Sequence, residues 1–206
     1  MKRAAVGFRV HSGWTAMIAV AVAKDFPELL ARRRIHLVKT FTYEYRQPYH
    51  TAAKLSPDEA RAFIAHVESE SRALALAALR DLKVELEKQD YSLERSGLLL
   101  ASGRPLPALE KILASHSLIH TADGELFRKA LLYAAARCGL APLTIKEREL
   151  VDSASKALRS RPANLTRRVA ELGRGLGPPW SQDEKLASLV AWLAISSRSP
   201  LSAKAR

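Results

Sequence analysis

The chain has 206 residues, of which 48% are hydrophobic and 26% are charged, a profile that suits one substantial globular domain. Lys and Arg total 33 against 21 Asp and Glu, and the formal net charge of +12 favours polyanionic partners, nucleic acid before an anionic membrane surface. General solubility of a basic protein is the alternative explanation. The single cysteine, Cys138, excludes an internal disulfide and a cysteine-based metal cage, and this usage predicts a cytoplasmic protein.

Three β-strands in succession are predicted near the N-terminus. Residues 4–10 form a short apolar run, and residues 14–23 form a second one after a His-Ser-Gly turn. A linker is expected next, which holds Pro27 and the basic cluster 32–34. Alternating apolar and polar residues over 35–46 then predict a third strand, so that the three strands form an antiparallel meander.

The same N-terminal stretch admits a second interpretation as a secretory signal, because Lys2 and Arg3 precede the apolar run 14–23. Arg9 and His11 interrupt the hydrophobic stretch, and the run is too short to span a bilayer. We therefore expect this segment to stay in the folded domain. No membrane association is predicted, because no other segment approaches transmembrane length.

The sharpest local signal is the sequence Ser-Pro-Asp-Glu at 56–59. It forms a capping box that predicts a long amphipathic helix ending near Gln89. The glycine-bracketed apolar run 96–103 predicts a buried fourth strand. The remaining elements are expected in this order: helices over 105–115 and 122–138, with the second ending at Gly139, a strand over 140–145, helices near 147–159 and 163–174, and a last helix from Ser181 to Ile195.

Three segments carry a family resemblance. They are AAVGFRVHSGWTAMIAVAV (4–22), GELFRKALLYAAARCGLAPLTI (124–145) and LTRRVAELGRGLGPPWSQDEKLASLVAWLAI (165–195). These segments resemble the first two strands, a helix-to-strand passage and the closing segment of RuvC-type Holliday junction resolvases, which are members of the ribonuclease H-like superfamily. The resemblance and the element order predict an α/β fold, in which helices flank a mixed five-stranded sheet made of a three-stranded antiparallel meander and two further strands. One such domain is expected over 1–195, followed by a flexible basic tail over 196–206.

The family's chemistry requires clustered carboxylates that hold two divalent metal ions. The resemblance places the first-strand aspartate position near Arg9 and the fourth-strand glutamate position at or beside Ser102. Only Asp183 and Glu184 correspond to acids of the final helix, and a second capping box that begins at Ser181 also accounts for both. A cation in place of a metal ligand opposes metal binding, so we expect no two-metal catalysis and no cofactor. Asp183 is kept as a candidate catalytic residue.

A dense group of possible metal ligands or acid–base groups lies between residues 116 and 125. His116, His120, Asp123 and Glu125 could hold a divalent metal ion or transfer protons. The alternative is a helix that begins after Thr121, with the two acids in its first turn. A metal-dependent hydrolase or nuclease, with a non-standard site near His120, Asp123 and Glu125, is therefore an alternative function.

Arginines dominate the segment 159–174, where Glu171 is the only acid. Guanidinium groups bind phosphate oxygens without reading base sequence, whereas a solvated helix face would have the same composition. The predicted nucleic-acid-binding residues are Arg159, Arg161, Arg167, Arg168 and Arg174. A second basic cluster, 32–34, is followed by aromatic residues that could stack unpaired bases or pack in the core, namely Tyr43, Tyr45 and Tyr49.

The preferred hypothesis is thus a non-catalytic ribonuclease H-like domain that binds nucleic acid through basic helices. The sequence leaves DNA and RNA undistinguished. A protein-interaction module on the same scaffold is a further alternative.

Overall fold

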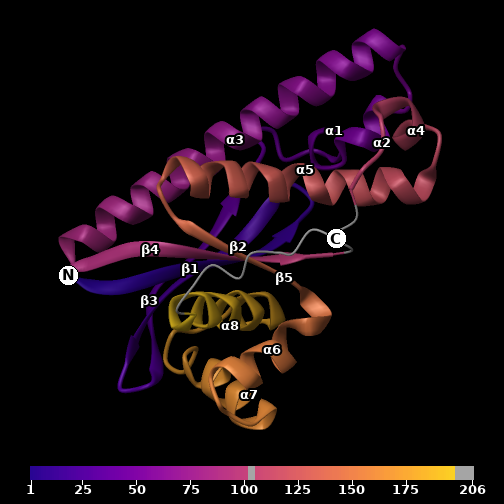
Figure 1. The fold of residues 1–206 in the computed structure, drawn as a ribbon. Coiled ribbons are helices and arrows are strands. Elements are labelled where there is room, and N and C mark those ends of the chain that lie inside the picture. Colours follow the sequence, from indigo (N-terminus) through magenta and orange to yellow (C-terminus); the bar gives the residue numbers. More distant parts are fainter. Residues whose placement is uncertain (102–104, 198–206) are drawn as a thin grey trace.

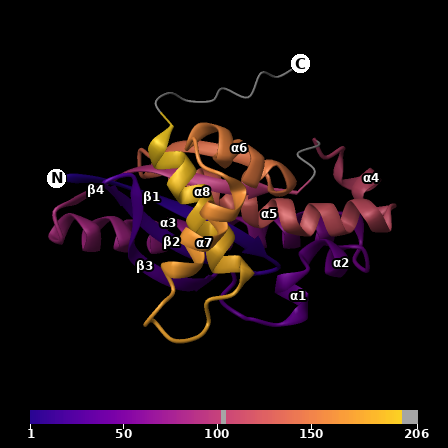
Figure 2. The ribbon, with the colours of Figure 1, turned by 90° about the horizontal axis from the view of Figure 1, so that it is seen from below.

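A mixed sheet lies between two layers of helices in the computed structural model, which describes residues 1–101 and 105–197 (Figure 1). The long helices α3 (Pro57–Lys88) and α5 (His116–Arg137) cover one face of the sheet. The apolar helix α8 (Gln182–Ser196) crosses the other face, and it packs chiefly on three of the strands. Figure 2 shows this second layer from its outer side. Each face of the sheet therefore has its own hydrophobic core.

The sheet has the strand order β3-β2-β1-β4-β5. β1 (Lys2–His11), β2 (Trp14–Ala23) and β3 (Phe26–His36) form an antiparallel meander. β4 (Tyr91–Leu100) runs parallel to β1, and β5 (Ala141–Lys146) runs parallel to β4. The predicted α/β class, with three meander strands and two further strands, is confirmed.

Shorter helical segments fill the connections. The segment between β3 and α3 contains two of them, and most of the others lie on the α8 side. Their bounds are α1 (Tyr43–Arg46), α2 (Pro48–Ala52), α4 (Leu109–Leu113), η1 (Glu147–Glu149), α6 (Leu150–Ala157) and α7 (Pro162–Glu171).

The prediction of the third strand was wrong. It placed the strand over 35–46, whereas β3 ends at His36 and Tyr43–Arg46 form the helix α1. The basic cluster 32–34 consequently lies on a strand and not in a linker. After His36 the alternating stretch belongs to a loop and to α1, where Tyr45 packs against Phe63 at a ring distance of 5.7 Å.

Two features concealed the true third strand. The β2–β3 hairpin turns at Lys24 and Asp25, whose φ angles are 49° and 67°. A two-residue hairpin turn favours such positive φ values, but its usual sequence signal is Asn or Gly. Pro27 also argues against a central strand, but β3 lies at the sheet edge, where proline is tolerated.

Two further element boundaries differ from the prediction. β4 begins at Tyr91 and not at residue 96. The prediction missed its first half because polar residues there interrupt the apolar pattern. α5 begins at His116 and not at residue 122. Thr121 therefore does not cap it, and its hydroxyl instead donates to the Ser117 carbonyl oxygen within the helix, at 3.0 Å. The capping box at Ser56 is confirmed.

Two glycines on adjacent strands let α8 approach the sheet closely. A Cβ atom added at Gly7 would lie 2.0 Å from the Ala187 carbonyl oxygen, and one added at Gly97 would lie 2.6 Å from the Val190 carbonyl oxygen. Backbone of α8 therefore occupies the space that side chains would fill. The pair of glycines fixes the height of α8 above β1 and β4.

We expect Gly7→Ala to lower the free energy of unfolding by about 3 kcal/mol or more, because α8 would have to shift away from the sheet. Urea denaturation followed by circular dichroism measures the effect. The control is Gly139→Ala, because a Cβ atom there meets no atom within 4 Å but keeps a positive φ of 72°. We expect the control to lose only about 1–2 kcal/mol from backbone strain. A Gly7→Ala protein as stable as the wild type would contradict this account.

Candidate functional site

Arg9 forms the centre of an ion-pair cluster near the end of β1, on the face that α8 covers. Its Nε atom lies 3.0 Å from Glu147 Oε2 and 4.0 Å from Asp183 Oδ1. The Arg9 side chain is 22% exposed, so solvent screens these ion pairs only in part. Two carboxylates therefore converge on one guanidinium group.

Three elements that are distant in sequence bring these groups together. Glu147 begins η1 directly after β5, and Asp183 lies in the first turn of α8. The capping box of α8 uses Glu184, whose Oε2 accepts from the Ser181 backbone N–H at 2.7 Å. The carboxylate of Asp183 points instead to His11, with 2.8 Å between Oδ1 and the imidazole Nε2. The two neighbouring acids thus have different roles, and only Glu184 completes the cap.

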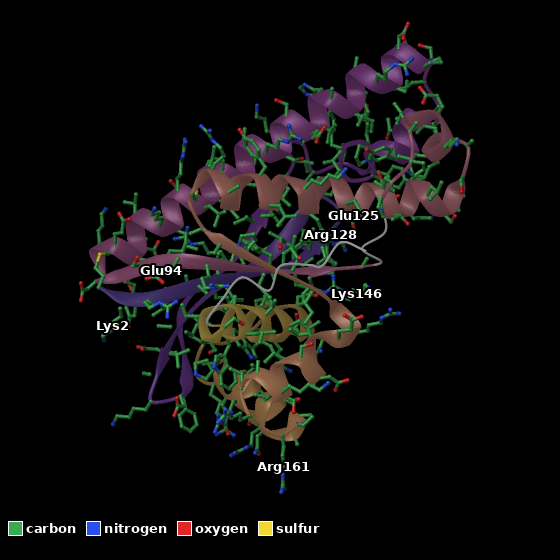
Figure 3. All side chains as sticks on the ribbon, viewed as in Figure 1. Lys2, Glu94, Glu125, Arg128, Lys146 and Arg161 are labelled. Atoms are coloured by element: carbon green, nitrogen blue, oxygen red, sulfur yellow. The ribbon has the colours of Figure 1, made fainter. Side chains whose placement is uncertain are left out.

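A second ion pair on α5 borders this cluster. Arg128 Nη1 lies 3.1 Å from Glu125 Oε1, and its Nε donates to the Leu99 carbonyl oxygen at 3.1 Å. Figure 3 shows both side chains between α5 and the sheet. Burial lowers the pKa of Arg128 and the Arg9 cation lowers it further, whereas Glu125 and Glu147 oppose this effect. The sheet end therefore holds an alternating arrangement of cations and carboxylates.

The remaining predicted acid–base residues lie in a different cluster, between α2 and the start of α5. Asp123 is buried, and its carboxylate accepts from the Tyr49 backbone N–H at 2.7 Å and contacts His50 Nδ1 at 2.5 Å. Burial raises the pKa of Asp123, although both hydrogen bonds oppose the rise. The imidazole Nε2 atoms of His116 and His120 lie 3.0 Å apart. We name His50, His116, His120 and Asp123 the imidazole cluster.

The structure therefore divides the predicted group. His120 and Asp123 belong to the imidazole cluster, whereas Glu125 pairs with Arg128. His50 was missed because it lies far from the other histidines in sequence, in a segment that gave no functional signal. Ser102 lies outside the described residues.

The predicted nucleic-acid-binding arginines lie on and around α7, on the outer side of α8. Figure 3 shows Arg161 projecting from the end of this layer. Arg167 pairs with Glu171 at 3.7 Å but stays 65% exposed. Arg168 is half-buried, and its guanidinium carbon lies 4.1 Å from the centre of the Phe26 ring. The exposed members of the set are Arg159, Arg161, Arg167 and Arg174.

Cations also stack on aromatic rings near the Arg9 cluster. The guanidinium carbon of Arg34 lies 3.6 Å from the centre of a Trp14 ring, and His11 stacks on Trp14 with 4.3 Å between ring centres. Arg46 covers Phe41 at 4.6 Å. Because His11 also contacts Asp183, the first stack continues directly into the ion-pair cluster.

These stacks differ from the predicted combination of the cluster 32–34 with tyrosines. Arg32 donates to the carbonyl oxygens of Gly177 and Pro179, both at 2.9 Å, and so anchors the loop before α8. Arg33 pairs with Glu85 of α3. The pKa of Tyr49 is raised to about 12, chiefly by burial, as expected for a phenol within the protein.

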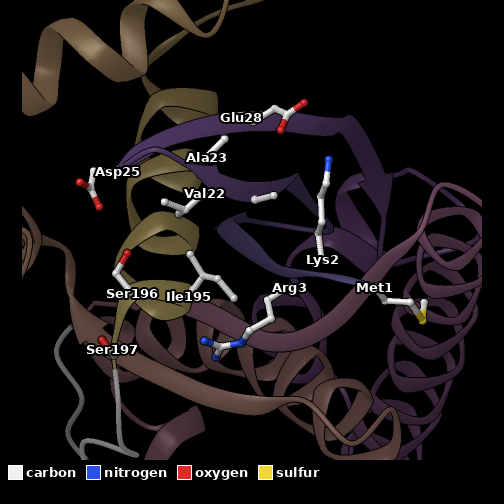
Figure 4. Close-up of a pocket in the computed structure, with 11 residues that line it drawn as sticks. Met1, Lys2, Arg3, Val22, Ala23, Asp25, Glu28, Ile195, Ser196 and Ser197 are labelled. Atoms are coloured by element: carbon white, nitrogen blue, oxygen red, sulfur yellow. The ribbon is translucent and has the colours of Figure 1, made fainter.

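A cavity of about 750 Å³ lies at the other end of the sheet, between the start of β1 and the end of α8 (Figure 4). Lys2 and Arg3 line it together with Asp25 and Glu28. Arg3 pairs with Glu94 at 2.6 Å, so this cavity does not concentrate charge of one sign.

Comparison with known proteins rests on structure. No protein-family model and no curated protein sequence matches the chain. Thermus thermophilus RuvC in complex with a Holliday junction substrate aligns with a TM-score of 0.52 at 11% sequence identity, covering 93% of this chain and 91% of RuvC. A second T. thermophilus RuvC structure gives a TM-score of 0.50 at 12% identity, and the match covers 92% of both chains. The chain has a RuvC-like fold.

The RuvC-like fold confirms the ribonuclease H-like architecture that the sequence predicted. Among the helices of the described ranges, none combines the length and the apolar character that crossing a bilayer requires.

Proposed function

We propose that this RuvC-like domain binds nucleic acid and does not cleave it by two-metal catalysis. The observation that argues against two-metal catalysis is the position of Arg9, whose guanidinium group pairs with Glu147 and lies 4.0 Å from Asp183 at the end of the first strand. The family resemblance expects a metal-binding aspartate near this position. A cation there offsets the charge of the carboxylates and repels a divalent ion.

Two surfaces on the α8 side support binding. The exposed arginines around α7 offer guanidinium groups to a sugar-phosphate backbone. The stack of His11, Trp14 and Arg34 lies on the same side of the sheet and adds the exposed Arg34 guanidinium group to the cations there. The T. thermophilus RuvC of the comparison was solved with a Holliday junction, so a four-way DNA junction is the appropriate first ligand.

We expect the protein to bind a fluorescently labelled four-way DNA junction with a log–log salt slope of about −4, equivalent to roughly a few hundredfold weaker binding between 50 and 200 mM salt. Fluorescence anisotropy on the junction, a duplex and a single strand measures this. The same mixtures with Mg²⁺ or Mn²⁺ should leave the DNA intact on a denaturing gel.

Absence of binding at 50 mM salt, or binding that does not change with salt, would overturn the binding proposal. Cleavage that is lost in Asp183→Asn would restore two-metal chemistry at the sheet end. Cleavage that is lost in Asp123→Ala would instead favour the alternative of a hydrolase at the imidazole cluster.

A further inference from the structure

The imidazole cluster joins two elements that the nucleic-acid proposal does not use. His116 and His120 lie one turn apart on the same face of α5, and His50 comes from α2. Both elements lie on the sheet face opposite α7 and α8 (Figure 1). The cluster therefore calls for an explanation of its own.

Its dimensions suit one metal ion. One imidazole nitrogen from each of the three histidines lies within 4.8 Å of the other two. The Nε2 atoms of His116 and His120 are 3.0 Å apart, whereas two nitrogens on a tetrahedral zinc ion stand about 3.3 Å apart for Zn–N bonds of about 2.0–2.1 Å. Small side-chain rotations would therefore place all three nitrogens around one ion.

Asp123 supplies the support that metal-binding histidines usually have. Its buried carboxylate contacts His50 Nδ1 at 2.5 Å and accepts the Tyr49 backbone N–H at 2.7 Å, which fixes the carboxylate relative to α2. An imidazole whose Nδ1 is held by a carboxylate presents Nε2 to a metal, a pattern that also raises ligand basicity.

We propose that His50, His116 and His120 bind one divalent ion of the zinc class, with Asp123 as the positioning residue. Imidazole ligands favour Zn²⁺, Co²⁺ and similar ions, whereas Mg²⁺ and Ca²⁺ prefer oxygen ligands. Three protein ligands leave the fourth tetrahedral position to water or another small ligand. The competing explanation is a metal-free group of hydrogen-bonded imidazoles, which would show the same short distance between the Nε2 atoms of His116 and His120.

The test uses the full chain without a polyhistidine tag, stripped with a chelator and then titrated with Co²⁺ by absorption spectroscopy and with Zn²⁺ by calorimetry. We expect one ion per chain, with the visible absorption bands of low-coordinate Co²⁺. His116→Ala and His120→Ala should weaken Zn²⁺ binding by at least about tenfold, and Asp123→Asn by about 10–100-fold. At the same Zn²⁺ concentration, the rise in melting temperature should be larger for the wild type than for His120→Ala.

The matched control is His66→Ala, which removes an exposed histidine from α3 and should leave the affinity unchanged. Absence of stoichiometric binding by the wild type would overturn the proposal. Equal loss in the His66→Ala control, or unchanged affinity in His120→Ala, would do so too. If circular dichroism shows that Asp123→Asn does not fold, the His116→Ala and His120→Ala variants, which alter exposed residues, still test the proposal. DNA binding by the wild type does not enter this test, so the two proposals fail separately.

Discussion

A protein carrying Arg161→Ala, Arg167→Ala and Arg174→Ala together should bind a DNA junction at least about a hundredfold more weakly at 0.1 M salt. All three side chains are exposed on or beside α7, and none belongs to the ion-pair cluster. If each makes one phosphate contact, the log–log salt slope becomes shallower by about 2.7. For two proteins that bind equally at 1 M salt, this slope change makes the variant bind roughly 500-fold more weakly than the wild type at 0.1 M salt. Anisotropy titrations across a salt series measure both quantities.

The matched control also removes three positive charges, but from the opposite face of the domain. Arg80→Ala, Lys88→Ala and Arg137→Ala alter exposed residues of α3 and α5 and leave the same net charge as the test variant. We expect the control to keep most of the salt slope, because only the long-range attraction is reduced. An equal loss in both proteins would show that net charge, and not the surface around α7, determines binding.

Arg9→Asp should create a divalent metal site at the sheet end. The substitution removes the cation that pairs with Glu147 and Asp183 and adds a third carboxylate beside them. Without metal, repulsion should cost about 1–3 kcal/mol of unfolding free energy, less than for a fully buried pair because the Arg9 and Glu147 side chains are 22% and 40% exposed. Bound Mn²⁺ should reverse this loss, by about 2.7 kcal/mol at a hundredfold excess over its Kd.

Thermal unfolding with and without Mn²⁺ tests this prediction. The wild type should show no stabilisation by Mn²⁺ attributable to this cluster. The double variant Arg9→Asp with Asp183→Asn should lose the gain, because one of the three carboxylates is then neutral. Stabilisation of equal size in the single and double variants would place the ion elsewhere and remove this support for a lost metal site.

The sequence predicts most of the architecture because its signals are local. The capping boxes at Ser56 and Ser181 mark the starts of α3 and α8, and the apolar runs mark β1 and β2. The third strand was missed because Lys24 and Asp25 form its turn without the usual residues, and because Pro27 is acceptable only at an edge that the sequence does not reveal.

The candidate sites were predicted less well because they depend on contacts between distant segments. Arg9 was singled out by the family resemblance, but its partner Glu147 has no local signal and lies on the far side of β4. Likewise, the pairing of His50 with Asp123 joins residues 73 positions apart. Periodicity indicates which face a residue occupies but not which remote side chain meets it.

The backbone contact between α8 and the glycines of β1 and β4 has a consequence for residue 9. The spacing between α8 and the strands β1 and β4 is set by the lack of side chains at Gly7 and Gly97 and not by the side chains of the ion-pair cluster. We therefore expect an exchange of charge at residue 9 to leave the main chain in place. Single substitutions at this position can therefore change the charge at the sheet end while the scaffold stays the same.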